Sequence, residues 1–185
     1  MLRILLMCLA LALVSGSGIV AAECPLVLEE PILITSVGQS IDALIIKTIF
    51  DDMGVRADFQ PLFQADGVEH YGQIVISSGI SYKGIAAAGT TLESEVERAK
   101  AIVEAAQAQS VPLILMYLGG FIQGDANSQQ LLDILTPHVD VIIVYRDSRG
   151  PLDYFTNLAE EQRIPLFFLA DMGNLCEEVT LIFSP

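Results

Sequence analysis

The stretch QIVISSGISYKGIAAAG, residues 73–89, joins a β-branched run to a glycine-rich loop. The run 74–76 is typical of a buried strand, and the loop that follows has glycines at 79, 84 and 89 around a single lysine, Lys83. A helical pattern begins directly afterwards at Thr90. A strand, a glycine-rich loop and a helix in this order place free backbone N–H groups at a helix N-terminus. We therefore interpret the stretch as the floor of a binding site.

On both sides of this stretch, short apolar runs alternate with helical patterns. We expect strands over 31–36, 56–63, 74–77, 111–117, 139–145 and 164–170, and helices over 41–53, 90–109, 127–135 and 151–162. Continuous apolar runs alternating with helices predict an α/β fold: a three-layer α/β/α sandwich, Rossmann- or flavodoxin-like, with a mainly parallel sheet of five to six strands. The expected strand order is 2-1-3-4-5-6, with Pro61 placing the second strand at a sheet edge. We expect a short tail from about residue 171 to Pro185.

The N-terminus has the pattern of a secretory signal peptide. Arg3 precedes an unbroken apolar run over 4–14, and small residues follow up to Ala22. We expect a signal peptide over 1–22, a single α/β domain over 23–185, and an exported protein, either periplasmic or extracellular. Cleavage would leave no stable membrane insertion, whereas a retained segment is just long enough to serve as an anchor.

Cysteine content and charge limit the possible partners. After removal of the signal peptide, Cys24 and Cys176 remain, and they either form a disulfide between the two ends of the domain or stay as unpaired thiols. The formal charge of −14 disfavours nucleic acid and anionic membrane surfaces as partners. No Cys/His cluster has metal-site spacing, so we expect no metal.

The candidate site follows from the expected strand order. Ligands of doubly wound sheets bind beyond the carboxyl ends of the strands, where the winding direction reverses, here between the first and third strands. Glycine-containing loops would meet there, and glycine lets the backbone approach a ligand closely. The candidate ligand-binding residues are Gly38, Gln39, Ser40, Gly79, Ser81, Lys83, Gly84, Gly89, Gly119 and Gly120. Each of these residues can also be explained without a ligand, as a turn residue, a helix cap or a solvated loop residue.

Known catalytic and nucleotide-binding patterns are absent from the sequence. The glycine-rich loop matches neither the Walker pattern nor the dinucleotide fingerprint, and Glu93 and Glu95 in the next helix oppose a phosphate. His70 and His138 precede strands and are expected at the opposite sheet edge. We expect a protein that binds a small polar or anionic ligand. The sequence specifies neither a cofactor nor an oligomeric state. Two alternatives stay open: an enzyme that uses Lys83 and loop amides on a carbonyl or acyl substrate, and a module that docks another exported protein.

Several motifs together resemble a known family. They are the stretch Ile34-Thr-Ser-Val-Gly-Gln-Ser40, the pattern G-x-S-x-K-G-x-x-A-A-G over 79–89, the residues Glu93, Glu95 and Arg98, and the pair Gly119-Gly120. They resemble an uncharacterised prokaryotic family of small exported proteins, a domain of unknown function. The resemblance covers nearly the whole mature chain and implies a Rossmann-like α/β fold and export, without an activity. Members often carry a histidine before the paired glycines and arginines after them, which this chain lacks. If the family's ligand is an anion, that departure weighs against the same ligand here.

Overall fold

The computed structural model describes residues 26–119, 125–147 and 152–183. The predicted signal peptide, Cys24 and Gly120 lie outside the described residues, so the question whether Cys24 pairs with Cys176 lies outside them too. No helix within these three ranges combines the length and the apolar character needed to cross a bilayer.

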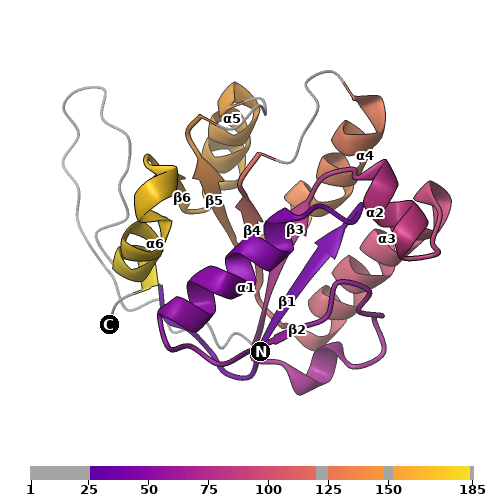
Figure 1. Cartoon of the computed structure of the whole chain (residues 1–185), viewed down its shortest axis with the longest axis horizontal. Coiled ribbons are helices and arrows are strands. Elements are labelled where there is room, and N and C mark those ends of the chain that lie inside the picture. The colour runs from indigo at the N-terminus through magenta and orange to yellow at the C-terminus, as the bar shows by residue number, and fades with distance from the viewer. Residues whose placement is uncertain (1–25, 120–124, 148–151, 184–185) are drawn as a thin grey trace.

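One six-stranded sheet forms the centre of the molecule (Figure 1), with the strand order β2-β1-β3-β4-β5-β6. Every neighbouring pair of strands is parallel. The strands are β1 Ile32–Val37, β2 Ala57–Phe59, β3 Gln73–Ser78, β4 Leu113–Tyr117, β5 Val141–Tyr145 and β6 Leu166–Leu169. All residues of β1, β3 and β4 are buried, which explains why these strands are continuous apolar runs in the sequence. The predicted parallel sheet and its strand order are confirmed.

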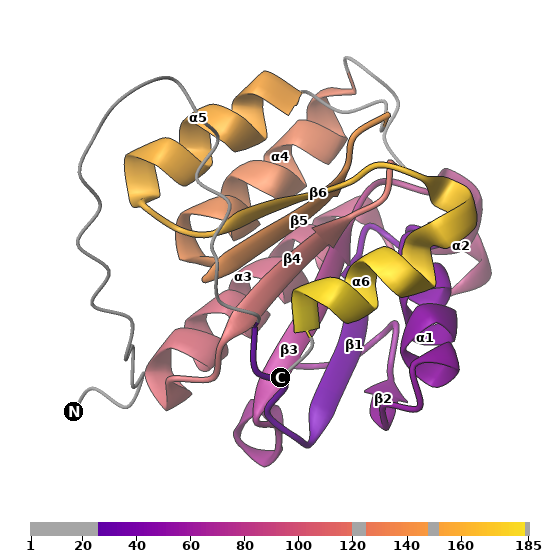
Figure 2. The ribbon, with the colours of Figure 1, turned by 90° about the vertical axis from the view of Figure 1, so that its left-hand side faces the viewer.

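Helices cover both faces of the sheet, as Figure 2 shows. The helices α1 (Asp42–Asp52) and α6 (Leu175–Phe183) pack on one face, together with strand residues such as Ile34 and Val75. The helices α3 (Leu92–Gln109), α4 (Ala126–Leu135) and α5 (Leu152–Gln162) pack on the other face. Two apolar cores result because successive strand side chains point to opposite faces. The predicted three-layer arrangement is confirmed.

Two helices occupy segments in which none was expected. The helix α2 (Tyr82–Ala87) lies inside the predicted glycine-rich loop, and Ser81 caps it by accepting a hydrogen bond from Gly84 N at 3.0 Å. The short turn η3 (Met172–Asn174) and α6 replace the predicted tail, so that prediction was wrong. The reason is packing: Val179 and Phe183 of α6 are buried, and the Phe183 ring contacts Phe50 of α1.

Two smaller differences concern element boundaries. The helix α3 begins at Leu92, after the predicted start at Thr90, and its N-cap is Thr91, whose Oγ1 accepts from Ser94 N at 3.2 Å. The strand β2 is shorter than predicted, and Pro61 follows it in the connection to the 3-10 turn η1 (Val68–His70). A second 3-10 turn, η2 (Thr136–His138), leads into β5.

Candidate functional site

The loops that leave β1 and β3 lie side by side at the carboxyl edge of the sheet. Gly79 N donates to Val37 O at 3.1 Å, and Ser81 N donates to Gly38 O at 2.8 Å. The approach is so close that a Cβ on Gly38 would lie 2.5 Å from Gly79 O. Gly38 also has a φ of 80°, a conformation that glycine adopts without steric cost. The structure therefore requires glycine at position 38.

Helix α2 closes over Gln39. A Cβ on Gly84 would lie 2.7 Å from Gln39 O, so Gly84 allows the helix to approach this loop. Gln39 itself has a φ of 59°, in the left-handed region that non-glycine residues seldom adopt. Such a conformation persists when the surrounding contacts determine it. The loop after β1 is thus held in one conformation by its neighbours.

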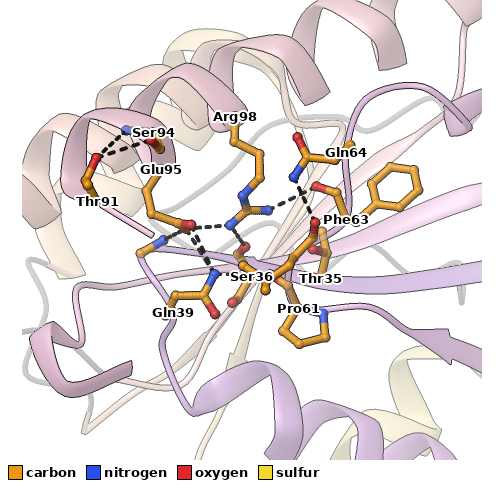
Figure 3. A network of polar contacts seen from close by, with 12 residues as sticks. Thr35, Ser36, Gln39, Pro61, Phe63, Gln64, Thr91, Ser94, Glu95 and Arg98 are labelled. Carbon is orange, nitrogen blue, oxygen red and sulfur yellow. Dashed lines mark hydrogen bonds and ion pairs between the residues drawn. The ribbon is translucent and has the colours of Figure 1, made fainter. Parts of the chain in front are cut away.

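A carboxylate of the protein itself occupies the donors of this loop. Glu95 Oε2 accepts from Gly38 N at 2.8 Å, and Gln39 Nε2 contacts the two carboxylate oxygens of Glu95 at 3.1 and 3.2 Å (Figure 3). Gln39 Nε2 also donates to Pro61 O at 3.2 Å. Glu95 is 1% exposed. A backbone amide and a side-chain amide that were predicted to meet a ligand are therefore bound from inside the fold.

Arg98 neutralises Glu95 and connects it to two further segments. Its Nη2 pairs with Glu95 Oε2 and also donates to Ser36 O at 2.7 Å. Its Nη1 donates to Phe63 O at 3.3 Å, in the connection after β2. Arg98 is 6% exposed, so little water reaches either charge of the pair. Each charge is therefore stabilised mainly by the other and by the hydrogen bonds around it. We call Glu95 and Arg98 the buried ion pair; it joins α3 to β1 and to the connection after β2.

Three other predicted polar residues have different surroundings. Ser40 is buried and its Oγ accepts from Asp42 N at 3.2 Å, in the turn that begins α1. Ser81 is the N-cap of α2. Lys83 is exposed on the first turn of α2. Ser40 and Ser81 thus have a structural role in the loops, and Lys83 is the one of the three that is open to solvent.

The remaining predicted glycines are Gly89, Gly119 and Gly120. Gly89 follows α2 with a φ of 67°, and no atom lies within 4 Å of the position of a Cβ there. Gly119 follows β4 with a φ of 110°. Gly120 lies outside the described residues. The structure therefore brings residues 38–40 and 79–84 together, while the prediction for the third loop stays a prediction.

Sequence reasoning missed a set of buried polar side chains at the same edge. We call them the carboxyl-edge cluster: Ser36, Asp42, Ser77, Ser78 and Tyr117, each between 0 and 3% exposed. Ser36 and Ser77 are register partners in β1 and β3 and point toward the side of α1, whereas Ser78 and Tyr117 point toward the side of α3. The pattern that could have revealed the four strand residues of the cluster is a hydroxyl residue at the end of an otherwise apolar strand.

The cluster is rich in hydroxyl groups that stay neutral. No hydrogen-bond partner for the Oγ atoms of Ser36, Ser77 and Ser78 is found among the described residues. Burial, and then the carboxylate of Asp42, raise the pKa of Tyr117 well above its ordinary value. The Tyr117 ring also packs on Phe155, with the centroids 5.1 Å apart. At neutral pH this edge therefore offers hydroxyl groups, which both donate and accept, beside a buried carboxylate.

Both histidines lie away from this edge. His70 ends η1 and His138 ends η2, in the turns that lead into β3 and β5. In a parallel sheet these turns lie at the amino-terminal edge, opposite the carboxyl-edge cluster. Within the part of the chain that the structure describes, no group of three or more His, Cys, Asp or Glu side chains could hold a metal ion.

The comparisons with known proteins give a family and a distant structural likeness. The model of a family described as "Domain of unknown function (DUF6305)" matches residues 29–183. The crystal structure of TesA is similar at 12% identity with a TM-score of 0.30, covering 73% of this chain and 76% of that chain. A monoethylphosphonate-inhibited structure of the psychrotrophic esterase EstA from Pseudoalteromonas sp. is similar at 12% identity with a TM-score of 0.30, covering 75% of this chain and 76% of that chain. No curated protein matches. A structural likeness this low carries no argument about activity.

Proposed function

We propose that this chain, which belongs to the DUF6305 family, is an exported protein that binds a small polar ligand at the carboxyl edge of β1, β3 and β4. One observation carries the proposal: Ser36 and Ser77 are buried register partners on the same side of the sheet, and their hydroxyl groups have no partner among the described residues. Leaving a buried hydroxyl unsatisfied costs about 1–3 kcal/mol, and native proteins contain few such groups. A ligand with several hydrogen-bonding groups would supply the partners. Export rests on the signal-peptide pattern of residues 1–22.

The contacts at this edge favour a neutral or cationic ligand over an anion. An anion needs donors, but Gly38 N and Gln39 Nε2 already bind Glu95, and Ile80 N donates to Ser128 Oγ at 3.3 Å. Hydroxyl groups, by contrast, accept hydrogen bonds from an alcohol, an amide or an ammonium group. We therefore propose a polyol, an amide or an amine as the ligand class.

A second candidate function is the docking of another exported protein at the same edge. Three exposed apolar side chains come from the segments next to Gln39: Ile41 is 67% exposed, Leu62 is 42% exposed and Tyr82 is 54% exposed. Leu62 follows Pro61, whose carbonyl accepts from Gln39, and Tyr82 begins the helix that closes over Gln39. Apolar side chains grouped in this way are typical of contact surfaces.

A thermal-shift screen tests the small-molecule proposal. Polyols, amides and amines are compared with carboxylates of matched size, because a ligand that binds the native state raises its Tm. We expect a neutral or cationic compound to raise the Tm of the wild type, to raise it less in Ser36→Ala and Ser77→Ala, and to raise it fully in Ser94→Ala. Ser94 is an exposed serine on α3 and serves as the matched control.

Two outcomes contradict this proposal, and one favours the docking alternative. If none of the compounds raises the Tm, or if carboxylates stabilise the protein more than the other classes, the proposed ligand class is wrong. If a partner protein is captured by the wild type and lost in Ile41→Asp, with the fold intact by circular dichroism, the edge is a docking surface.

A further inference from the structure

We propose a second binding site, for a small zwitterion with the chemistry of a free amino acid, in a cavity at the amino-terminal ends of β1 and β2. The cavity has a volume of about 690 Å³. Sites for small molecules are commonly of this size. It lies at the opposite edge of the sheet from the carboxyl-edge cluster, because it is lined by the first residues of both strands, Ile32 and Ala57.

The walls of the cavity leave room for a ligand. Ile32 and Ala57 are register partners and contribute apolar surface. The end of α1 and the turn at Gly54 form the other side. Gly54 has a φ of 74°, and no atom lies within 4 Å of the position of a Cβ there, so this turn borders open space.

Arg56 gives the cavity an available donor for a carboxylate. Its side chain is exposed, and no ion pair or hydrogen bond joins it to another of the described residues. A guanidinium group presents parallel N–H groups that match the two oxygens of a carboxylate. Lys47, the other cation of the cavity, already pairs with Asp51 one turn along α1. Arg56 is therefore the group that we expect to hold the carboxylate of the ligand.

The same cavity provides negative charge for an ammonium group. Glu30 and Asp58 line it with carboxylates, whereas Asp51 is already paired with Lys47, and the last turn of α1 contains no basic residue. A helix C-terminus carries partial negative charge, which favours a cation nearby. A simple anion would also be repelled by the formal charge of −14 on the chain, whereas a zwitterion has no net charge. The site therefore matches both ends of a zwitterion better than it matches either charge alone.

Three probes of equal side chain test this inference by NMR titration of the full chain. They are L-alanine, N-acetyl-L-alanine, which lacks the ammonium charge, and L-alanine amide, which lacks the carboxylate. We expect saturable amide shifts at residues 54–58 with L-alanine, and a loss of affinity of about tenfold or more with each of the other two, because each loses a charge-assisted contact.

Arg56→Gln should weaken the binding of L-alanine by at least about tenfold, while Lys100→Gln, an exposed cation on α3, should leave it unchanged. The inference is overturned if L-alanine produces no saturable shift, if N-acetyl-L-alanine binds as tightly as L-alanine, or if Arg56→Gln binds like the wild type. Because Ser36 and Ser77 lie at the other edge, their alanine variants should retain this binding, which keeps the result independent of the proposed function.

Discussion

Replacing Arg98 by methionine removes the positive member of the buried ion pair and keeps a side chain of similar length. Three contacts are lost: the pairing with Glu95, and the hydrogen bonds to the carbonyl groups of Ser36 and Phe63. Glu95 is then a buried carboxylate whose remaining donors are Gly38 N and Gln39 Nε2. Breaking a buried pair from one side typically costs about 3–5 kcal/mol, because an uncompensated charge stays inside. We expect a loss of this size in the free energy of unfolding.

For a chain of this length, each kcal/mol lowers Tm by about 2–4 °C, so Arg98→Met should lower Tm by about 6–20 °C. Urea unfolding at pH 7, followed by circular dichroism, measures the free energy directly. Lys47→Met is the matched control, since Lys47 and Asp51 form an ion pair on the surface of α1. Surface pairs contribute about 0–1 kcal/mol, so this variant should stay close to the wild type.

The double variant Glu95→Gln/Arg98→Met separates a charge effect from a packing effect. If the cost of Arg98→Met comes from the stranded carboxylate, neutralising Glu95 should restore about 1–3 kcal/mol, because glutamine keeps an oxygen that can accept from Gly38 N. The reasoning is refuted if Arg98→Met loses no more stability than Lys47→Met. It is also refuted if the losses of Glu95→Gln and Arg98→Met simply add in the double variant.

Two further predictions concern the carboxyl edge. Gly38→Ala should lower the free energy of unfolding in urea by about 2–4 kcal/mol, because it combines a strained φ with a Cβ 2.5 Å from Gly79 O. Gly89→Ala has the strained φ alone and should cost about 1 kcal/mol. Equal losses in the two variants would contradict the close packing at Gly38. Burial raises the pKa of Tyr117 in the folded protein, so ionisation of this phenol favours the unfolded chain. The free energy of unfolding should therefore be unaffected below pH 10, the ordinary pKa of tyrosine, and should fall as the pH rises above it. Tyr117→Phe should reduce this alkaline loss, and an equally steep loss in that variant would contradict the prediction.

The sheet could be predicted because its physical cause is visible in the sequence. A strand buried on both faces must be apolar at successive positions, and Ile32–Ile34 and Leu113–Met116 satisfy that condition. Right-handed crossovers then restrict the order in which such strands can be placed. The alternation of runs and helices therefore predicted a parallel sheet, while the order of its strands was chosen among the common doubly wound orders with Pro61 placing the second strand at an edge.

The two unexpected helices depend on contacts that the sequence does not display. Helix α2 is only six residues long and contains a glycine, so neither its length nor its composition predicts it. Its position depends on the Ser81 cap and on the space that Gly84 leaves for Gln39. Helix α6 contains enough apolar residues to be recognised from the sequence, and its packing on α1 is what the expectation of a short tail left out.

The role of Glu95 in the structure differs from the role that the sequence suggested. In the sequence, an acidic residue at the start of α3 argues against a phosphate near the glycine loops. In the fold, the same carboxylate is buried and binds the loop after β1 itself. Its spacing of three residues from Arg98 was visible, and on an exposed helix such a pair would contribute little. What the spacing does not reveal is that both charges are covered by β1 and by the connection after β2.

This internal carboxylate changes what the glycine loops can do. A loop whose amides were free would favour anions, and its glycines would be present for close approach of a ligand. Here Gly38 and Gly84 are present so that β1, β3 and α2 approach one another, and the donor of Gly38 serves Glu95. Among the described residues, the hydroxyl groups of Ser36, Ser77 and Ser78 have no hydrogen-bond partner, and they lie at the ends of β1 and β3. Recognition at this edge is therefore expected to depend on strand hydroxyls, with the loops serving as the rigid frame that the buried ion pair holds in place.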